Sequence, residues 1–296
     1  MQGTVEEFSY GAVTPLVGFV MACLGAALGL RCTARSLLVS HSRRPAWLAL
    51  GSAAIGSGIW TMHFVAMMGF TVAESPVDFD IPITFASLGI AIVMVGVGIF
   101  IVGYRGATGT ALFTGGTITG LGVASMHYLG MAGIRLDGRL TYNTFTVAAS
   151  VVIAVVAATA ALWAAGQIRG FLWSVGASLV MGLAVSGMHY TGMAALTVHL
   201  HGAEAATGDS TAAATLAPML IGPLVFLLLA GAVVIFDPLM IAGRPVQVPQ
   251  ERKPGIPAAA VIPHPHRRPE VTAGPPRIGQ GAHPASHHGS RTPQNR

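Results

Sequence analysis

Residues 83–104 read ITFASLGIAIVMVGVGIFIVGY and contain no Lys, Arg, Asp or Glu. A run of about 20 apolar residues is long enough to cross a bilayer as a helix. Similar runs recur along the 296 residues, of which 53% are hydrophobic and only 9% charged, with a mean hydropathy of +0.66. Soluble domains carry about 25% charged residues. The composition therefore excludes an ordinary soluble enzyme and predicts an integral membrane protein.

Seven apolar runs have the length of a membrane span, and none has a charged residue in its interior. They are 13–30, 46–70, 83–104, 110–134, 145–165, 171–198 and 216–236. Their continuous apolar character differs from the alternating pattern of membrane β-strands. We expect an all-α, polytopic bundle of seven transmembrane helices over 13–236, preceded by a short extracytoplasmic segment over 1–12.

The charged residues predict the orientation of this bundle. Arg105, Arg169 and the four arginines of the first loop fall on one side of an alternating topology, whereas the other side has only Arg135 and Arg139. Eight of the 11 acidic residues fall on that other side: Glu6, Glu7, Glu74, Asp78, Asp80, Asp137, Glu204 and Asp209. Because basic loops remain cytoplasmic, we expect the N-terminus outside and the C-terminus inside.

Residues 237–296 differ in composition from the spans. They contain 12 of the 18 prolines and five histidines, His264, His266, His283, His287 and His288. Such a segment buries too little apolar surface to offset its ordering entropy, so we expect a disordered cytoplasmic tail. Its basic residues either lie in solvent, which we favour, or contact anionic lipid.

Three seven-residue segments share one pattern: a small residue, Met, His, an aromatic residue, any residue, a small residue and Met. They are 61–67 (TMHFVAM), 125–131 (SMHYLGM) and 187–193 (GMHYTGM). Their histidines, His63, His127 and His189, are 64 and 62 residues apart, about the length of two spans with their loops. A period of two spans returns the chain to the same face. The three motifs are therefore expected in the outer thirds of the second, fourth and sixth spans.

Each histidine and the methionine four residues later lie on one helix face. These methionines are Met67, Met131 and Met193, while Met62, Met126 and Met188 lie about 100° round the helix. Polar groups inside a span normally face the bundle interior, so the three histidines are expected to face one another. A shared metal site of these nine residues follows, against the alternative of a packing motif copied three times.

Ligand chemistry favours copper at this site. Thioether sulfur suits Cu(I) and imidazole suits both copper states, whereas Mg²⁺ and Ca²⁺ prefer oxygen. Zinc gains little from thioether, and a haem with six-coordinate iron has no use for a third His–Met pair. Tyr128 and Tyr190 either donate hydrogen bonds within the site or belong to an interfacial aromatic belt. His199 and His201 are expected in a solvated outer loop, with metal capture as the alternative.

Small residues suggest where helices pack closely. The pairs Gly25/Gly29 and Gly116/Gly120 have the spacing that lets two membrane helices approach each other. The two cysteines, Cys23 and Cys32, are too few for a disulfide-rich scaffold.

The triple motif on alternate spans resembles the MHYT domain of bacterial integral-membrane sensor proteins, over about residues 10–240. The resemblance implies a multi-pass location in the bacterial plasma membrane, copper binding through the nine residues above, and a diatomic gas ligand such as oxygen, CO or NO. The third motif alone reads Met-His-Tyr-Thr in full; the first has Phe64 and Val65, and the second has Leu129. Family members often carry cytoplasmic cyclic-di-GMP domains. None is visible in this sequence, so we expect either that a signal passes to a separate cytoplasmic signalling partner or that the domain has another role.

The leading interpretation is a non-enzymatic membrane sensor or signalling domain without a nucleic-acid partner. The alternative is a copper transporter or metal-handling protein, which needs ligands below the outer cluster; Met21, Cys23, Met94 and Met181 are scattered candidates. An enzyme that uses the metal for redox chemistry is the least favoured, because the spans offer no general base beyond the histidines.

Overall fold

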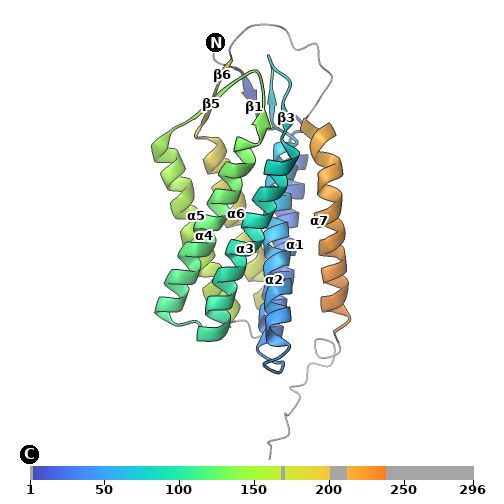
Figure 1. The fold of residues 1–296 in the computed structure, drawn as a ribbon, viewed down its shortest axis with the longest axis vertical. Coiled ribbons are helices and arrows are strands. Elements are labelled where there is room, and N and C mark those ends of the chain that lie inside the picture. The colour runs from blue at the N-terminus through green and yellow to red at the C-terminus, as the bar shows by residue number, and fades with distance from the viewer. Residues whose placement is uncertain (1–2, 168–170, 201–211, 238–296) are drawn as a thin grey trace, which may run out of the picture. The chain divides into compact units, whose positions relative to one another are not determined.

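A computed structural model describes residues 3–167, 171–200 and 212–237 (Figure 1). Within these ranges the chain forms seven long helices and six short strands. The helices are α1 (Val13–Ser36), α2 (Arg44–Met67), α3 (Ile81–Arg105), α4 (Gly109–Ala132), α5 (Thr144–Gln167), α6 (Phe171–Met193) and α7 (Ala212–Ile235). The strands are β1 (Val5–Glu6), β2 (Thr71–Val72), β3 (Asp78–Phe79), β4 (Ile134–Arg135), β5 (Gly138–Tyr142) and β6 (Leu196–Leu200).

All seven expected helices are present, and six of them are long and apolar enough to cross a membrane. The exception is α4, which has 24 residues but is rich in Gly and Thr. It packs between α3 and α5. The structure is therefore a helical bundle of the kind found in multi-pass membrane proteins.

The outer ends of three predicted spans were wrong. Those spans were expected to reach residues 70, 134 and 198, but α2, α4 and α6 end at Met67, Ala132 and Met193. Residues 68–70 form a turn that leads into strand β2, whereas Ile134 and residues 196–198 belong to strands β4 and β6. Strand pairing satisfies backbone N–H and C=O groups beyond a helix end, so the apolar run continues while the helix does not.

The strands divide the chain into three successive units, and in each unit a strand before the first helix pairs with a strand after the second helix. Strand β1 pairs antiparallel with β2, β3 with β4, and β5 with β6, and each pair encloses two consecutive helices. The units are thus β1–α1–α2–β2, β3–α3–α4–β4 and β5–α5–α6–β6. In Figure 1 the labelled strands lie at one end of the bundle, at the same end as the C-termini of α2, α4 and α6.

Six helices form a ring in chain order. Each helix from α1 to α6 contacts the next one, and α6 closes the ring on α1. The second helices of the three units, α2, α4 and α6, also contact one another. The seventh helix lies outside this ring against α2 and α1, as Figure 1 shows for the orange helix beside the blue pair. The three units therefore have an approximately threefold arrangement.

Glycines let the helices approach as the sequence suggested. A Cβ on Gly25 of α1 would lie 2.7 Å from the Cα of Gly58 on α2. A Cβ on Gly120 of α4 would lie 2.4 Å from the Cα of Val155 on α5. Gly29 and Gly116 likewise face neighbouring helices at distances that exclude a side chain. The prediction of close helix packing at these glycines is confirmed.

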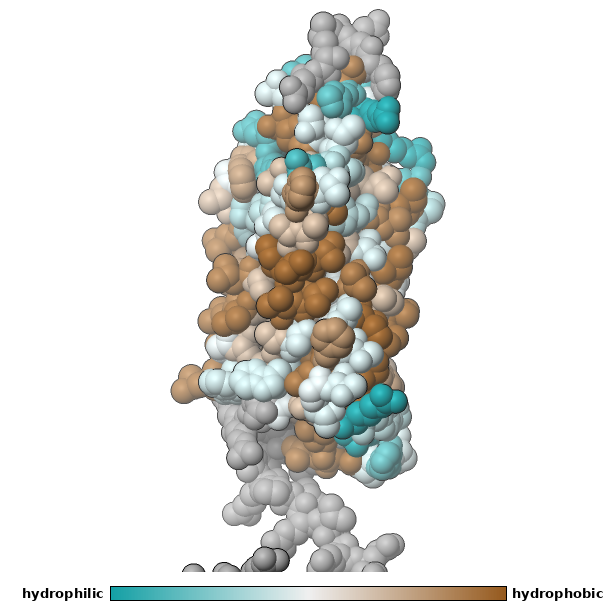
Figure 2. All heavy atoms as spheres, turned by 90° about the vertical axis from the view of Figure 1, so that its left-hand side faces the viewer, coloured by the Kyte–Doolittle hydropathy of each residue, from teal (hydrophilic) through white to brown (hydrophobic). Residues whose placement is uncertain are grey.

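The described charges divide between the two ends of the bundle. The space-filling view in Figure 2 shows a broad hydrophobic band with hydrophilic side chains towards both ends. One buried ion pair lies at the end away from the strands: Arg35 Nε of α1 is 2.6 Å from Asp237 Oδ2, which follows α7. Asp237 was expected to begin the disordered tail but is buried; the rest of that tail, 238–296, lies outside the described residues.

Candidate metal centre

Three histidine side chains meet in the interior of the ring, and we call them the histidine trio: His63 of α2, His127 of α4 and His189 of α6. All three are buried, with 0%, 0% and 2% of their surface exposed. Each lies within the last turns of its helix, close to the end that carries the strands. The expected convergence of the three rings is therefore present in the structure.

The Nδ1 atoms of the trio form a nearly equilateral triangle. His63 Nδ1 lies 3.0 Å from His189 Nδ1 and 3.2 Å from His127 Nδ1, and the third side is 3.3 Å. Within the described part of the chain, this is the one group of at least three His, Cys, Asp or Glu residues placed to share a metal ion. The rings are steeply inclined to one another, at 77° to 89°.

Hydrogen bonding alone cannot satisfy this triangle. A neutral imidazole nitrogen either carries a hydrogen or offers a lone pair. Among three nitrogens, at least two are therefore of the same kind, and those two cannot hydrogen-bond to each other. Buried polar atoms without partners are rare and often point to a missing ion or water. A cation shared by the three Nδ1 lone pairs satisfies all of them at once.

The size of the triangle fits a metal ion. Metal–imidazole bonds of about 2.0 Å with tetrahedral angles place ligand nitrogens about 3.3 Å apart. The Nδ1 separations of 3.0–3.3 Å agree with this spacing. Three protein ligands leave a fourth coordination position for an exogenous molecule, as in metal sites that bind small ligands.

The Nε2 atoms of His63 and His127 lie against glycine residues of the neighbouring motif helices. A Cβ on Gly130 would lie 2.7 Å from His63 Nε2, and a Cβ on Gly192 would lie 2.4 Å from His127 Nε2. Both Nε2 atoms are buried and have no hydrogen-bond partner among the described residues. Gly130 and Gly192 occupy the small position of the second and third motifs. The motif pattern shows that this position is small, but its place beside the imidazole of another helix cannot be read from the sequence.

Trp60 fixes the first motif to the neighbouring helix. Its indole Nε1–H donates to the carbonyl of Thr84 at 3.1 Å and to Ser87 Oγ at 3.0 Å. Both partners lie on α3, and the indole is fully buried. Since His63 follows Trp60 by one helical turn, this anchor restricts the rotation and shift of α2 at the level of the trio.

The six motif methionines are part of the main hydrophobic core. Met62, Met67, Met126, Met131, Met188 and Met193 are all buried, with at most 3% of their surface exposed. Thioether side chains fill irregular gaps well, so burial is compatible with packing and with ligation. Their assignment as ligands stays a prediction.

The rings of Tyr128 and Tyr190 lie edge-on against those of His127 and His189, with centroids 4.8 Å apart, and both tyrosines also contact neighbouring elements. The Tyr128 hydroxyl lies 2.7 Å from Ser150 Oγ on α5. The Tyr190 ring stacks on Phe8, with centroids 5.7 Å apart. Tyr128 therefore links α4 to α5, and Tyr190 links α6 to the segment between β1 and α1.

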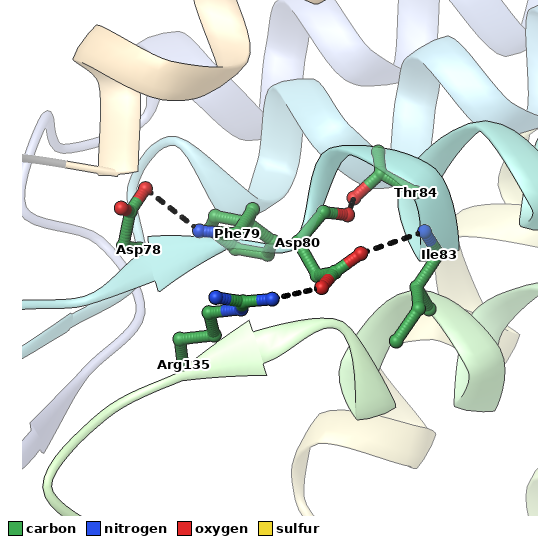
Figure 3. A network of polar contacts seen from close by, with 6 residues as sticks. All are labelled: Asp78, Phe79, Asp80, Ile83, Thr84 and Arg135. Atoms are coloured by element: carbon green, nitrogen blue, oxygen red, sulfur yellow. Dashed lines mark hydrogen bonds and ion pairs between the residues drawn. The ribbon is translucent and has the colours of Figure 1, made fainter.

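At the strand end of the bundle, an ion pair and a helix cap link the start of α3 to strand β4 of the second unit (Figure 3). Asp80 caps α3 by accepting the Ile83 N–H at 2.9 Å and forms an ion pair with Arg135 of β4. The hydrogen bond from Ile83 and the Arg135 guanidinium lower the pKa of Asp80 below its ordinary value. Asp80 was expected only as an outer-loop charge; its place two residues before Pro82 is a recognisable helix-start pattern.

Within the described residues, the histidine that the sequence offered as an alternative metal-capturing residue does not belong to the trio. His199 is exposed on β6, where it pairs with Arg139 of β5, so it lies in a strand and not in the loop that was expected. His201, Glu204, Asp209, Arg169 and the tail histidines lie outside the described residues. Cys23 and Cys32 are free thiols of α1.

Two stretches, 56–115 and 120–177, match the family model MHYT, described as a bacterial signalling protein N-terminal repeat. The first contains His63 and the second His127, while the third motif follows the second match. These two stretches are MHYT repeats. Each stretch that matches the family model begins within a helix that carries a motif and ends within the next such helix. The structural units have different boundaries, because each begins and ends with the two strands of a pair.

Curated relatives are signalling proteins. The chain is 36% identical over 192 residues to the bifunctional diguanylate cyclase/cyclic di-GMP phosphodiesterase MucR of Pseudomonas aeruginosa, covering 63% of this chain and 28% of that protein. It is 34% identical over 201 residues to the cyclic di-GMP phosphodiesterase NbdA of the same species, covering 66% and 25%. It is 30% identical over 198 residues to the signaling protein YkoW of Bacillus subtilis, covering 64% and 24%.

The MHYT chain thus spans about a quarter of the length of these relatives. No solved structure gives a significant match. The matching family model describes a repeat of bacterial signalling proteins, and one of the matched relatives is named as a signaling protein.

Proposed function

We propose that this MHYT domain senses its stimulus through one copper ion bound by His63, His127 and His189. The observation that carries the proposal is the triangle of Nδ1 atoms, with sides of 3.0–3.3 Å, in a fully buried position. Its geometry suits a metal ion, and hydrogen bonds alone leave at least one nitrogen pair unsatisfied.

The surroundings favour copper over zinc. Six buried methionines flank the trio in sequence, and thioether sulfur is a soft ligand that suits Cu(I). When bound, copper supplies a redox couple and an affinity for diatomic ligands such as oxygen, CO or NO. The protein residues hold the ion away from bulk water, and the apolar core around them raises the strength of any electrostatic change at the site.

The charge distribution supports a trio near the outer surface of the bacterial plasma membrane. The described acidic residues of the strand end are Glu6, Glu7, Glu74, Asp78, Asp80 and Asp137, and the described arginines of the opposite end are Arg31, Arg35, Arg43, Arg44 and Arg105. Basic residues remain on the cytoplasmic side. In this orientation α2, α4 and α6 carry changes at the trio inward.

The output of the domain is proposed from its relatives. MucR and NbdA are named for synthesis or hydrolysis of cyclic di-GMP. We infer that a change in ligation at the trio alters helix packing and controls a cytoplasmic protein of cyclic-di-GMP turnover. Such control requires two packings that differ in affinity for the stimulus. The proposal gives the MHYT domain itself no enzymatic activity.

Copper content tests the proposal. The purified chain should contain close to one copper per molecule, measured by atomic emission after growth with copper. The triple variant His63→Ala/His127→Ala/His189→Ala should contain less than a tenth of this amount. His41→Ala is the matched control, because His41 is exposed at the opposite end of the bundle, and it should retain the wild-type content. Equal copper in wild type and triple variant would refute the proposal.

Copper transport is less well supported. An inward path for an ion needs ligands beneath the trio, but the cavity there is lined almost entirely by aliphatic side chains. Of the candidate path residues, Met181 lines that cavity, while Met94 packs against Gly122 and Cys23 against Gly182.

A further inference from the structure

An apolar cavity lies inside the ring directly beneath the histidine trio. It holds about 40 Å³ and is lined by residues from all six ring helices. Ile59, Val123 and Val185 are among them, and each stands four residues before one histidine of the trio. Residues four apart lie on one helix face, about one turn or 5.4 Å along the axis. The cavity therefore begins one turn below each imidazole.

The lining of this cavity suits an apolar occupant better than water. A buried water needs two to four polar partners and about 10–15 Å³ of space. The space is sufficient, but the polar groups are few. Thr33 and Thr119 contribute hydroxyls to the lining; Thr33 Oγ1 already donates to the Gly29 carbonyl at 2.9 Å, while Thr119 Oγ1 is buried with no partner among the described residues. Because the hydroxyl of Thr33 has already used its donor, these two groups offer an ordered water no more than the minimum number of partners, and the rest of the side-chain lining offers none.

A second hollow, of about 380 Å³, lies between α5 and α6. Its rim includes Trp163 and Trp173, which are 49% and 54% exposed on the outside of the ring. In a membrane, this outer surface of the two helices faces lipid. The hollow is therefore open to the hydrocarbon region and not to water.

The two hollows adjoin. Ala157 and Ala161 of α5 and Met181 and Ala184 of α6 line both of them. Three of these four boundary residues carry only a methyl group, and the fourth is a flexible methionine that changes rotamer at low cost. A small molecule in the outer hollow is thus separated from the central cavity by small or movable side chains alone.

We propose that the α5–α6 hollow and the central cavity form one route by which a small apolar gas molecule passes from the bilayer to the histidine trio. This inference deepens the proposed function, since it supplies the ligand of the same site. Apolar gases concentrate in hydrocarbon because transfer out of water is favourable. Met188 lines the cavity immediately before His189 in the sequence, so the route ends at the trio.

Xenon binding tests the route without any metal. The metal-free full chain in lipid nanodiscs should bind xenon, detected by ¹²⁹Xe NMR. Ala161→Phe should reduce this binding at least tenfold, because the new ring fills the boundary between the two hollows. Val152→Phe is the matched control on α5, since Val152 is 61% exposed and lines neither hollow. Ala157→Leu makes a smaller change at the same boundary and replaces Ala161→Phe if circular dichroism shows that variant to be unfolded.

Ligand kinetics test whether the route serves the trio. In copper-loaded protein, CO rebinding after flash photolysis should slow at least tenfold in Ala161→Phe with unchanged copper content. Failure of wild type to bind xenon, equal xenon binding in wild type and both boundary variants, or a resident acyl chain found by native mass spectrometry in place of xenon would overturn the route. A wild-type chain that binds xenon but takes up no copper when grown with copper would refute the proposed function alone. A chain that takes up copper but binds no xenon in its metal-free form would refute the route alone.

Discussion

The backbone of Gly130 on α4 lies against the Nε2 edge of His63 on α2, where a Cβ at residue 130 would approach Nε2 to 2.7 Å. Gly192 on α6 lies in the same way against His127, with a corresponding distance of 2.4 Å. In both cases a glycine from one unit supports the imidazole of the preceding unit. The sixth residue of the motif, a glycine in the second and third copies, is thus a part of the site, because its size sets how closely the imidazole rings approach one another.

Gly130→Ala should therefore weaken metal binding. The added methyl group must displace the His63 ring, and neighbours that orient a metal ligand typically affect affinity by about 10- to 100-fold. Competition with a copper chelator measures the change. Gly187→Ala is the control within the third motif, since a Cβ there meets no atom within 4 Å. Similar copper affinity in both variants would contradict this account of Gly130.

Close packing of α1 on α2 predicts a stability effect. Gly58→Ala places a methyl group against the Gly25 Cα at 2.7 Å and should lower the free energy of unfolding by about 1–3 kcal/mol. Thermal unfolding in detergent measures it. Gly89→Ala on α3 meets nothing within 4 Å and should be neutral or stabilising by up to about 1 kcal/mol, because Ala favours helix more than Gly. A neutral Gly58→Ala would show that the two helices separate easily.

The buried ion pair between Arg35 and Asp237 should be costly to break on one side. Asp237→Ala leaves the Arg35 guanidinium largely buried, with 9% of its side chain exposed, and should destabilise the fold by about 3–5 kcal/mol. The double variant Arg35→Met/Asp237→Leu should recover most of this loss, because no unpaired charge remains. Unfolding monitored by tryptophan fluorescence gives both values, with the exposed Arg43→Ala as the control. A double variant as unstable as Asp237→Ala would contradict the explanation.

Acidification should weaken the strand end through Asp80. The pKa of Asp80 is lower in the folded chain than in the unfolded one, so its contribution to stability is complete above the unfolded pKa of about 3.8 and disappears as the pH falls through the folded pKa. Asp80→Asn should thus be less stable than wild type at pH 7, and the difference should vanish at strongly acidic pH. Chemical unfolding across this range tests it, with the exposed Asp137→Asn as the control. A difference that is constant with pH would contradict the role of the Asp80 charge.

The sequence predicted the helices, because the length of an apolar run shows whether it can cross a bilayer. It also predicted that the three histidines lie close together, because a period of two spans returns each motif to the same side of the membrane. His63, His127 and His189 could be placed at one depth without any knowledge of the ring. The closure of each unit by strands could not be predicted, because β1 to β4 have only two residues each, too few to show alternation. The LTVHL segment of β6 joined the apolar run of α6, so hydropathy alone extended the span.

Other features depend on which helices are neighbours. The contact of Gly130 with His63 links residues 67 positions apart and follows from the ring order, which no local pattern contains. The Arg35–Asp237 pair likewise requires the position of α7 beside α1. The cavity beneath the trio depends on side chains of six helices, and its alanine lining resembles ordinary span composition.

The seventh helix makes the number of described helices odd, so the two ends of the described chain lie at opposite ends of the bundle. Six helices return a polypeptide to the end of the bundle at which it started, and each of the three closed units does so on its own. Because α7 adds one odd crossing outside the ring, Asp237 stands at the end opposite to β1. The same helix covers α2, whose most apolar stretch is 83% buried, against 22% for that of α5. A shift of α2 at His63 therefore acts directly on α7, because the two helices are in contact. The C-terminal end of α7 lies at the end of the bundle opposite to the strands.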